Sequence, residues 1–275
     1  MKISVVIPTF NRKEALKRAI HSVKGQSLTP FEIIVVDDGS DDGTREWILY
    51  NHPQIKYIYQ TNNGVSSARN IGIKSAASDW VAFLDSDDEW LPTKLDIQAN
   101  AIMANPGTKF CHTNEIWIRN GVRVNQMKKH KKYGGLIFEK CLDICRMSPS
   151  SVLINQKIFD EIGMFDESLR VCEDYDLWLR ITSKFSVLFL DQLLIRKYGG
   201  HSDQLSKVDD GIESYRIQSL KKIISSKILN KDQSIILKNM LIHKLKIYAN
   251  GLEKRNKKDE LNEIKKNIEY WINIE

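Results

Sequence analysis

Four acidic residues lie within five positions in the stretch Asp85-Ser86-Asp87-Asp88-Glu89, directly after the apolar run Trp80 to Leu84. The run has the length of a buried strand rather than of a helix. Residues two apart in an extended segment project the same way, so the carboxylates of Asp85 and Asp87 can face one point beyond the strand end. Paired carboxylates bind hard cations such as Mg²⁺ or Mn²⁺, which often complete their coordination with water and substrate phosphates. An acidic surface turn is the alternative that this stretch alone leaves open.

A second acidic pair, Glu173-Asp174, opens a segment with a helical pattern that continues to about Arg180. A carboxylate can take the proton from a hydroxyl group if it lies within hydrogen-bond reach of it. Acidic residues at a helix start also favour the helix dipole, and Asp176 with Arg180 forms an i,i+4 pair. The pair by itself is therefore compatible with a catalytic role or a structural one.

The elements that must position these acids alternate regularly in the first third of the chain. Near-continuous apolar segments predict strands over residues 3–8, 31–36, 55–60 and 80–84, with helices between them at about 12–24, 45–50 and 66–76. This alternation indicates a parallel sheet covered on both faces. Ligands of such sheets bind beyond the carboxyl ends of the strands. The loops at that edge are all polar and comprise residues 8–11, 37–44, 62–64 and 85–88.

The pattern is less regular after Trp90. We expect a helix from Pro92 to about Asn105 and a hairpin of strands 109–119 and 122–124, because Asn120-Gly121 is a strong hairpin signal. A helix over 136–145 and strands at 151–154, 186–190 and 193–197 follow. From about residue 209 the period is helical, with breaks near Asn230 and Arg255. The sequence thus predicts an α/β fold with a mixed, mainly parallel sheet and a C-terminal helical appendage.

Length and composition limit the function classes. The 275 residues suit one domain or two, and 41 basic against 35 acidic residues give a formal charge of +6. Four cysteines in a chain of this size favour a reduced cytosolic protein. No run is long enough for a signal peptide or a membrane span, so we expect a cytoplasmic protein, with weak peripheral contact at the inner membrane face compatible with the lysine-rich tail. We expect no nucleic-acid partner, because the basic tail lacks interleaved aromatic residues.

Two further features favour structural roles. Cys141 and Cys145 are spaced i,i+4, but the four cysteines match no usual zinc pattern, so buried thiols are expected. The basic run Lys128–Lys132 could attract an anionic acceptor, but a solvated, mobile loop is the expectation.

Five segments in order resemble the family 2 glycosyltransferases, which are inverting enzymes of the GT-A fold that use nucleotide-sugar donors. The resemblance extends from the N-terminus to about Ser206. It rests on Val5-Val6-Ile7-Pro8-Thr9-Phe10-Asn11, Val35-Val36-Asp37-Asp38-Gly39-Ser40, Gly64 with Ala68-Arg69-Asn70, Phe83-Leu84-Asp85-Ser86-Asp87-Asp88, and Glu173-Asp174.

The resemblance implies a role for each of these segments. Pro8 and Thr9 would line the nucleotide, and Asp38, with Asp37 as the second candidate, would accept a hydrogen bond from a uracil or thymine base. Arg69, Asp85 and Ser86 would lie near the base, ribose or diphosphate, and Asp87 would hold Mn²⁺ or Mg²⁺, with His201 as an additional candidate ligand. Asp174 would be the general base, while Phe165 and Glu173 would contact the acceptor.

This resemblance divides the chain into a GT-A domain over 1–206 and a helical region over 207–275. The first would consist of a nucleotide-sugar-binding half, 1–104, and an acceptor-binding half, 105–206. The implied reaction is transfer of a sugar from a UDP- or dTDP-sugar to a hydroxyl of a saccharide, lipid-linked or other cell-envelope acceptor. A non-catalytic nucleotide- or carbohydrate-binding module and a metal-dependent phosphotransferase are the alternatives. The donor sugar, the acceptor and the oligomeric state are left open.

Overall fold

The structure is a computed structural model that describes residues 1–200 and 211–274. The strands in these ranges form one mixed sheet with the order β3-β2-β1-β4-β8-β6-β9-β5, and β7 pairs with β6. The strands are β1 Ile3–Thr9, β2 Glu32–Asp37, β3 Lys56–Tyr59, β4 Trp80–Phe83, β5 Glu89–Trp90, β6 Phe110–Arg119, β7 Val122–Val124, β8 Val152–Asn155 and β9 Leu188–Gly199.

The first four strands in the sheet order are parallel, as the alternation of strands and helices predicts. β8 runs antiparallel to β4 and β6, whereas β6 and β9 are parallel to each other. The carboxyl ends of β1, β2 and β4 consequently meet at one edge of the sheet. The mixed α/β architecture predicted from the sequence is confirmed.

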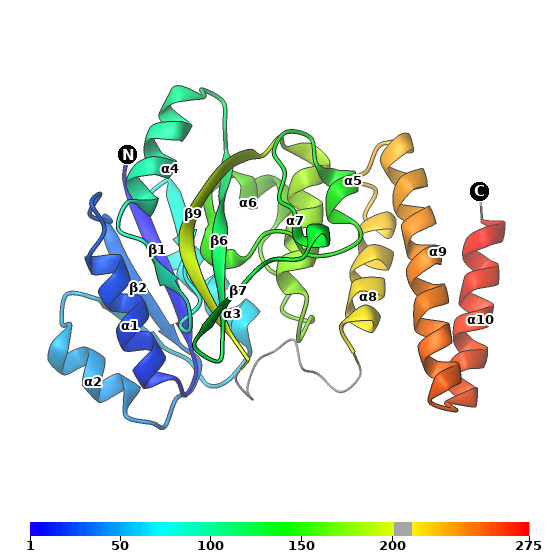
Figure 1. The fold of residues 1–275 in the computed structure, drawn as a ribbon, viewed down its shortest axis with the longest axis horizontal. Helices are drawn as coiled ribbons and strands as arrows, with labels where there is room; N and C mark the ends of the chain where they lie inside the picture. The colour runs from blue at the N-terminus through cyan, green and yellow to red at the C-terminus, as the bar shows by residue number, and fades with distance from the viewer. Residues whose placement is uncertain (201–210, 275) are drawn as a thin grey trace.

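Helices cover both faces of this sheet (Figure 1). Along β1, Val5 and Ile7 join the apolar cluster formed with α1 and α4, while Val6 joins the opposite cluster with α7. The helices are α1 Lys13–Lys24, α2 Thr44–Asn51, α3 Val65–Ser75, α4 Lys94–Ala104, α5 Phe138–Cys141, α6 Lys157–Ile162, α7 Glu173–Lys184, α8 Ile212–Ser225, α9 Lys231–Lys254 and α10 Lys258–Asn273, with short 3₁₀ turns η1 Lys128–His130 and η2 Pro149–Ser151.

Helix α3 lies unusually close to β1. A Cβ atom at Gly72 would be 2.2 Å from Cγ1 of Val6, so any residue other than glycine would displace the Val6 side chain or the helix. Arg69, about one turn earlier in the same helix, is thereby held near the carboxyl edge of the sheet.

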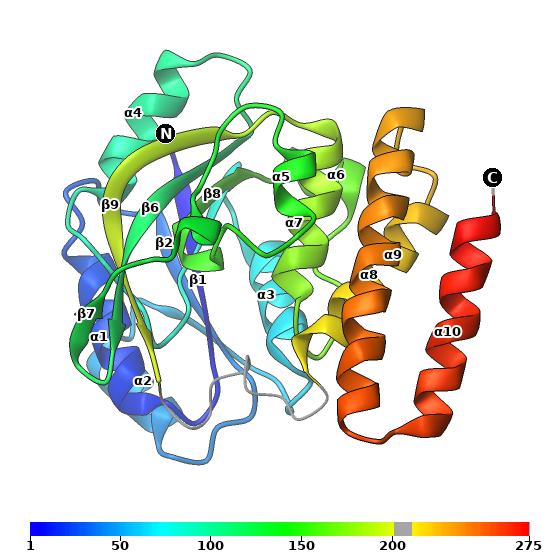
Figure 2. The ribbon, with the colours of Figure 1, turned by 45° about the vertical axis from the view of Figure 1, so that its right-hand side comes forward.

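The C-terminal helices extend away from the sheet, and α10 is the outermost of them (Figures 1 and 2). Asn230, where the sequence predicts a break, begins α9 with a capping box closed by Gln233. Leu220 and Leu241 belong to the same apolar cluster as Val6, so α8 and α9 share the core of the sheet. The proposed boundary at 206/207 lies outside the described residues. Within these residues, no helix combines the length and apolarity that crossing a bilayer requires.

Two local predictions are wrong. The helix predicted over 136–145 is only the single turn α5, because Asp143 accepts a hydrogen bond from the Ile144 N–H and ion-pairs with Arg146, which competes with helical bonding. The two strands predicted over 186–197 are one strand, β9, whose register with β6 shifts around Asn114. The irregular segment 142–148 after α5 lies next to the site described below.

Candidate functional site

The polar loops predicted at the carboxyl edge of the sheet contact one another. The Asp38 N–H donates to the carbonyl of Thr9 (2.8 Å), and the Asn11 N–H donates to Ser40 Oγ (2.8 Å). Pro8 and Thr9 are buried at the end of β1, and Thr9 Oγ1 has no hydrogen-bond partner within the described part of the chain. A buried hydroxyl of this kind at a strand end is available to a ligand.

Asp37 and Asp38 both organise the neighbouring loops. The Asp37 carboxylate accepts hydrogen bonds from the Ser40 N–H (2.9 Å) and the Tyr57 hydroxyl (2.7 Å), and burial together with this carboxylate raises the pKa of Tyr57. The Asp38 carboxylate accepts from the backbone N–H groups of Asn63 (2.8 Å) and Gly64 (2.9 Å). These bonds shape the edge of the sheet, and contact of either acid with a base stays a prediction.

The three aspartates after β4 have different partners. Asp85 pairs with Arg69 (2.7 Å), and Asp87 pairs with Arg12 (2.9 Å). Asp88 is buried and accepts from the Ser150 hydroxyl (2.6 Å). Ser86, between them, is buried.

The charges of these aspartates repel one another. Burial raises the pKa of Asp88 well above its usual range, and the charges of Asp87 and Asp85 raise it further. A divalent cation would relieve this repulsion, so the carboxylates of Asp85 and Asp87 fit such an ion. In residues 1–200 and 211–274, no three His, Cys, Asp or Glu side chains are arranged to hold a metal by themselves. Within these ranges the remaining ligands would come from substrate or water, and His201, the additional candidate ligand, lies outside the described residues.

Arg69 connects the aspartate motif to the second acidic pair. Its guanidinium, almost completely buried, donates to Asp85 (2.7 Å) and to Glu173 (2.6 Å), which is 104 residues away in the sequence. Burial opposes the charge of Arg69, but these two carboxylates raise its pKa overall. The ion pairs therefore fix the start of α7 against the carboxyl end of β4.

Phe165 and Glu173 both contact Arg69, and their contact with an acceptor stays a prediction. The Phe165 ring is 4% exposed and packs edge-on against Phe83 and Trp178, with the Arg69 guanidinium 5.1 Å from its centre. Glu173 is buried in its ion pair with Arg69. Both side chains thus support Arg69.

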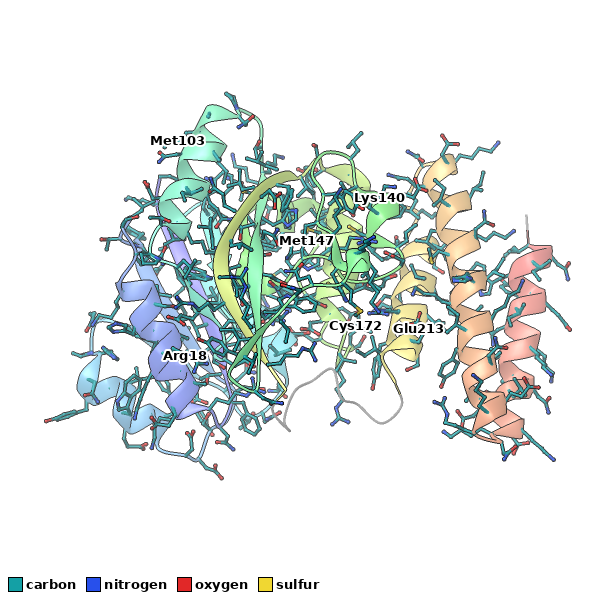
Figure 3. The ribbon with its side chains drawn as sticks, viewed as in Figure 1. Arg18, Met103, Lys140, Met147, Cys172 and Glu213 are labelled. Atoms are coloured by element: carbon teal, nitrogen blue, oxygen red, sulfur yellow. The ribbon has the colours of Figure 1, made fainter. Side chains whose placement is uncertain are left out.

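Asp174, the next residue, faces a pocket of about 200 Å³. Its Oδ1 accepts from the Tyr175 N–H (2.7 Å), and its Oδ2 lies 3.3 Å from the Cys145 Sγ. The pocket lies between β6, β9 and the segment 142–148, in the region around Met147 in Figure 3. Its lining includes Trp117, Arg119, Lys132, Cys145, Asp174 and Lys197.

Both signs of charge are present in this pocket. The buried Glu115 carboxylate pairs with Lys132 (3.1 Å), and despite burial, Lys132 and Lys197 lower the pKa of Glu115 to about 2. Burial lowers the pKa of Lys197, but four carboxylates outweigh this effect and raise the pKa overall. They belong to Glu115, Asp88, Asp85 and Asp174. Lys197 is thus a positive charge in the pocket lining that is stabilised both by the aspartate motif and by Asp174.

Sequence reasoning missed most of this pocket. Lys132 belongs to the basic run expected to be a solvated, mobile loop, yet its side chain is buried against Glu115. Glu115 lies within the predicted strand 109–119, and Lys197 ends the predicted strand 193–197. A charged residue in an apolar strand pattern is a signal that could have pointed to a functional role for both. No zinc pattern is formed within the described ranges, and Cys145 instead contacts Asp174.

Comparison with known proteins identifies relatives of this chain. The model of glycosyl transferase family 2 matches residues 4–163, more than half of the chain. An uncharacterised glycosyltransferase of Rickettsia bellii is 33% identical over 216 residues, which are 74% of this chain but 31% of that protein. The Escherichia coli protein WfgD, named UDP-Glc:alpha-D-GlcNAc-diphosphoundecaprenol beta-1,3-glucosyltransferase, is 31% identical over 183 residues, 65% of this chain and 69% of WfgD. The chain therefore spans about a third of the length of the Rickettsia protein.

A solved structure shares the fold. Residues 1–349 of Staphylococcus aureus TarS, crystallised with UDP-GlcNAc, superimpose with a TM-score of 0.69 over 89% of this chain and 72% of that one. The sequence identity is 21%, so this likeness concerns the fold alone.

The Arg69 ion pairs give a testable prediction. We expect Arg69→Met to lower the free energy of unfolding by about 3–5 kcal/mol, because it leaves the Asp85 and Glu173 carboxylates without their buried partner. The measurement is urea unfolding followed by fluorescence. Lys109→Met, which breaks an exposed ion pair with Glu161, is the control and should cost less than about 1 kcal/mol.

The double variant Arg69→Met/Glu173→Gln should recover part of the loss, since it also removes the unpaired Glu173 charge. An Arg69→Met variant no less stable than Lys109→Met would contradict this account of the site.

Proposed function

Because the chain belongs to glycosyl transferase family 2, we propose that it transfers a sugar from a nucleoside-diphosphate sugar to an acceptor hydroxyl. The sheet with its flanking helices is the GT-A fold. The observation that carries the proposal is that Arg69 ties the aspartates after β4 to the helix that presents Asp174 to a pocket. A donor diphosphate at the aspartates and an acceptor in the pocket would then be adjacent.

A uridine donor and a saccharide or lipid-linked acceptor are favoured. TarS was crystallised with UDP-GlcNAc and with UDP, and the name of WfgD includes both a UDP-Glc donor and a GlcNAc-diphosphate lipid. A pocket of about 200 Å³ with Trp117 in its lining has room for one sugar ring. For a lipid-linked acceptor, contact with the inner membrane face would be peripheral.

In the proposed reaction, Asp174 acts as the general base. Its carboxylate takes the proton from the acceptor hydroxyl as the hydroxyl oxygen attacks the anomeric carbon. The bond from that carbon to the diphosphate breaks on the opposite side, the electron pair leaves with the diphosphate, and the configuration inverts. Asp174 then releases its proton to solvent.

The positive charges near the leaving group would assist its departure. Asp85 and Asp87 would hold Mn²⁺ or Mg²⁺, which when bound neutralises negative charge on the diphosphate. Lys197 contributes a second positive charge beside the same aspartates.

We expect UDP to raise the melting temperature more with Mn²⁺ than with a chelator, since a ligand that binds only the native state stabilises it by mass action. Asp87→Ala should remove this metal-dependent difference while the unliganded protein stays folded. Asp79→Ala, which removes an exposed acid at the opposite end of β4, is the matched control and should behave as the parent. Equal stabilisation with chelator would contradict the metal role, and no stabilisation by UDP or dTDP would contradict the donor site.

Asp174→Asn keeps the shape of the side chain and removes its basicity. UDP binding should survive, whereas UDP release from UDP-glucose or UDP-GlcNAc, with a saccharide acceptor or water, should slow by roughly 10²- to 10⁴-fold. Glu173→Gln should slow the reaction less, because Glu173 supports Arg69 and does not face the pocket. Parental turnover by Asp174→Asn would show that another group is the base.

A further inference from the structure

The segment 142–148 is attached to the first half of α7 by three side chains of that helix. The Tyr175 hydroxyl donates to the carbonyl of Leu142 (2.6 Å), and the Trp178 indole N–H donates to the carbonyl of Met147 (2.8 Å). The third contact is between Cys145 and Asp174. Since Tyr175 and Trp178 are almost fully buried, the segment and the helix form one packed unit. Figure 3 labels Met147 of this segment and Cys172, the residue before α7.

The Cys145 thiol has two acceptors within reach but only one proton. Its Sγ lies 3.3 Å from Asp174 Oδ2 and 3.3 Å from the Met147 carbonyl. That carbonyl already accepts the Trp178 N–H, and a carboxylate is the stronger acceptor because it is charged. The S–H group is therefore directed at Asp174.

The thiol stays protonated in this environment. Burial raises the pKa of Cys145 well above its usual range, and the negative charge of Asp174 raises it further. The other charged or titratable groups around this contact are Cys172, Glu173 and Tyr175 at the start of α7 and, in the pocket lining, Glu115, Arg119, His130, Lys132, Arg146, Lys197 and Tyr198. Lys197 lowers the pKa of Cys145, but its effect is smaller than that of burial and of Asp174.

We propose that Cys145 is a positioning residue for the general base: its S–H holds Oδ2 of Asp174 while the Tyr175 N–H holds Oδ1. This inference rests on the proposed function. Each carboxylate oxygen has two lone pairs, so one hydrogen bond on each still leaves room for the acceptor hydroxyl. Two donors from different elements restrict rotation of the carboxylate and keep it directed into the pocket.

The test compares Cys145→Ala and Cys145→Ser with the parent by UDP release from UDP-glucose or UDP-GlcNAc. Without a donor, the alanine variant should lose about fivefold to twentyfold in kcat, with UDP binding unchanged. The acidic limb of its pH–rate profile should move to higher pH by about half a unit, because a hydrogen bond to the ionised carboxylate is lost. Serine restores a hydrogen-bond donor. The Cys145→Ser variant should therefore recover most of kcat, and the acidic limb of its pH–rate profile should lie at the parental pH.

Cys141→Ala is the matched control, since it removes a buried thiol of α5 that does not contact Asp174. It should leave kcat and the pH profile unchanged. Should the alanine variant at 145 not fold, Cys145→Val replaces it, because valine fills the space of the thiol without supplying a donor.

Asp174→Asn, assayed in parallel, separates failure of this inference from failure of the proposed function. An inactive Asp174→Asn together with a Cys145→Ala variant of parental rate and pH profile would overturn the role of Cys145 alone. Equal losses in the alanine and serine variants with an unshifted acidic limb would also overturn it, because they would indicate packing only. An active Asp174→Asn would overturn both the base assignment and the inference.

Discussion

The buried guanidinium of Arg69 is the interaction on which the rest of the site depends. It donates to Asp85 at the end of β4 and to Glu173 at the start of α7, so it joins two segments that are far apart in sequence. A buried arginine is tolerable only when its donors are satisfied by charged partners, and each carboxylate needs the arginine for the same reason. This mutual requirement fixes the position of Asp174, which directly follows Glu173, relative to the aspartates.

Several structural features support that interaction. Gly72 lets α3 lie against β1, which brings Arg69 to the carboxyl edge of the sheet. Phe165 packs against the guanidinium and against Phe83 from β4. Segment 142–148 and Lys197 complete the far side of the pocket, so Asp174 lies at the start of a packed helix and against ordered segments. A preorganised arrangement of this kind is what transfer through an in-line displacement requires.

Much of the carboxyl edge of the sheet could be predicted from the sequence, because its determinants are local. Apolar strands end in polar loops, and Asp37, Asp38, Asp85 and Asp87 follow their strands directly. The pocket could not be predicted in the same way, since it joins β6, β9, segment 142–148 and α7 through contacts such as Glu115 with Lys132. The sequence likewise does not reveal that Phe165 and Glu173 are buried beside Arg69. The partners of a buried charge become apparent only once distant segments are placed together.

The central claim is that a base on α7 activates the acceptor hydroxyl, which attacks the anomeric carbon on the side opposite the diphosphate held at the aspartates. The stereochemistry of the product tests this claim most directly. The measurement is ¹H NMR of the first sugar product formed from UDP-α-glucose or UDP-α-GlcNAc, with an acceptor saccharide or water, before mutarotation. Direct displacement predicts a β-configured product. An α-configured product at the earliest times would contradict the account, because retention needs a different arrangement of groups around the anomeric carbon.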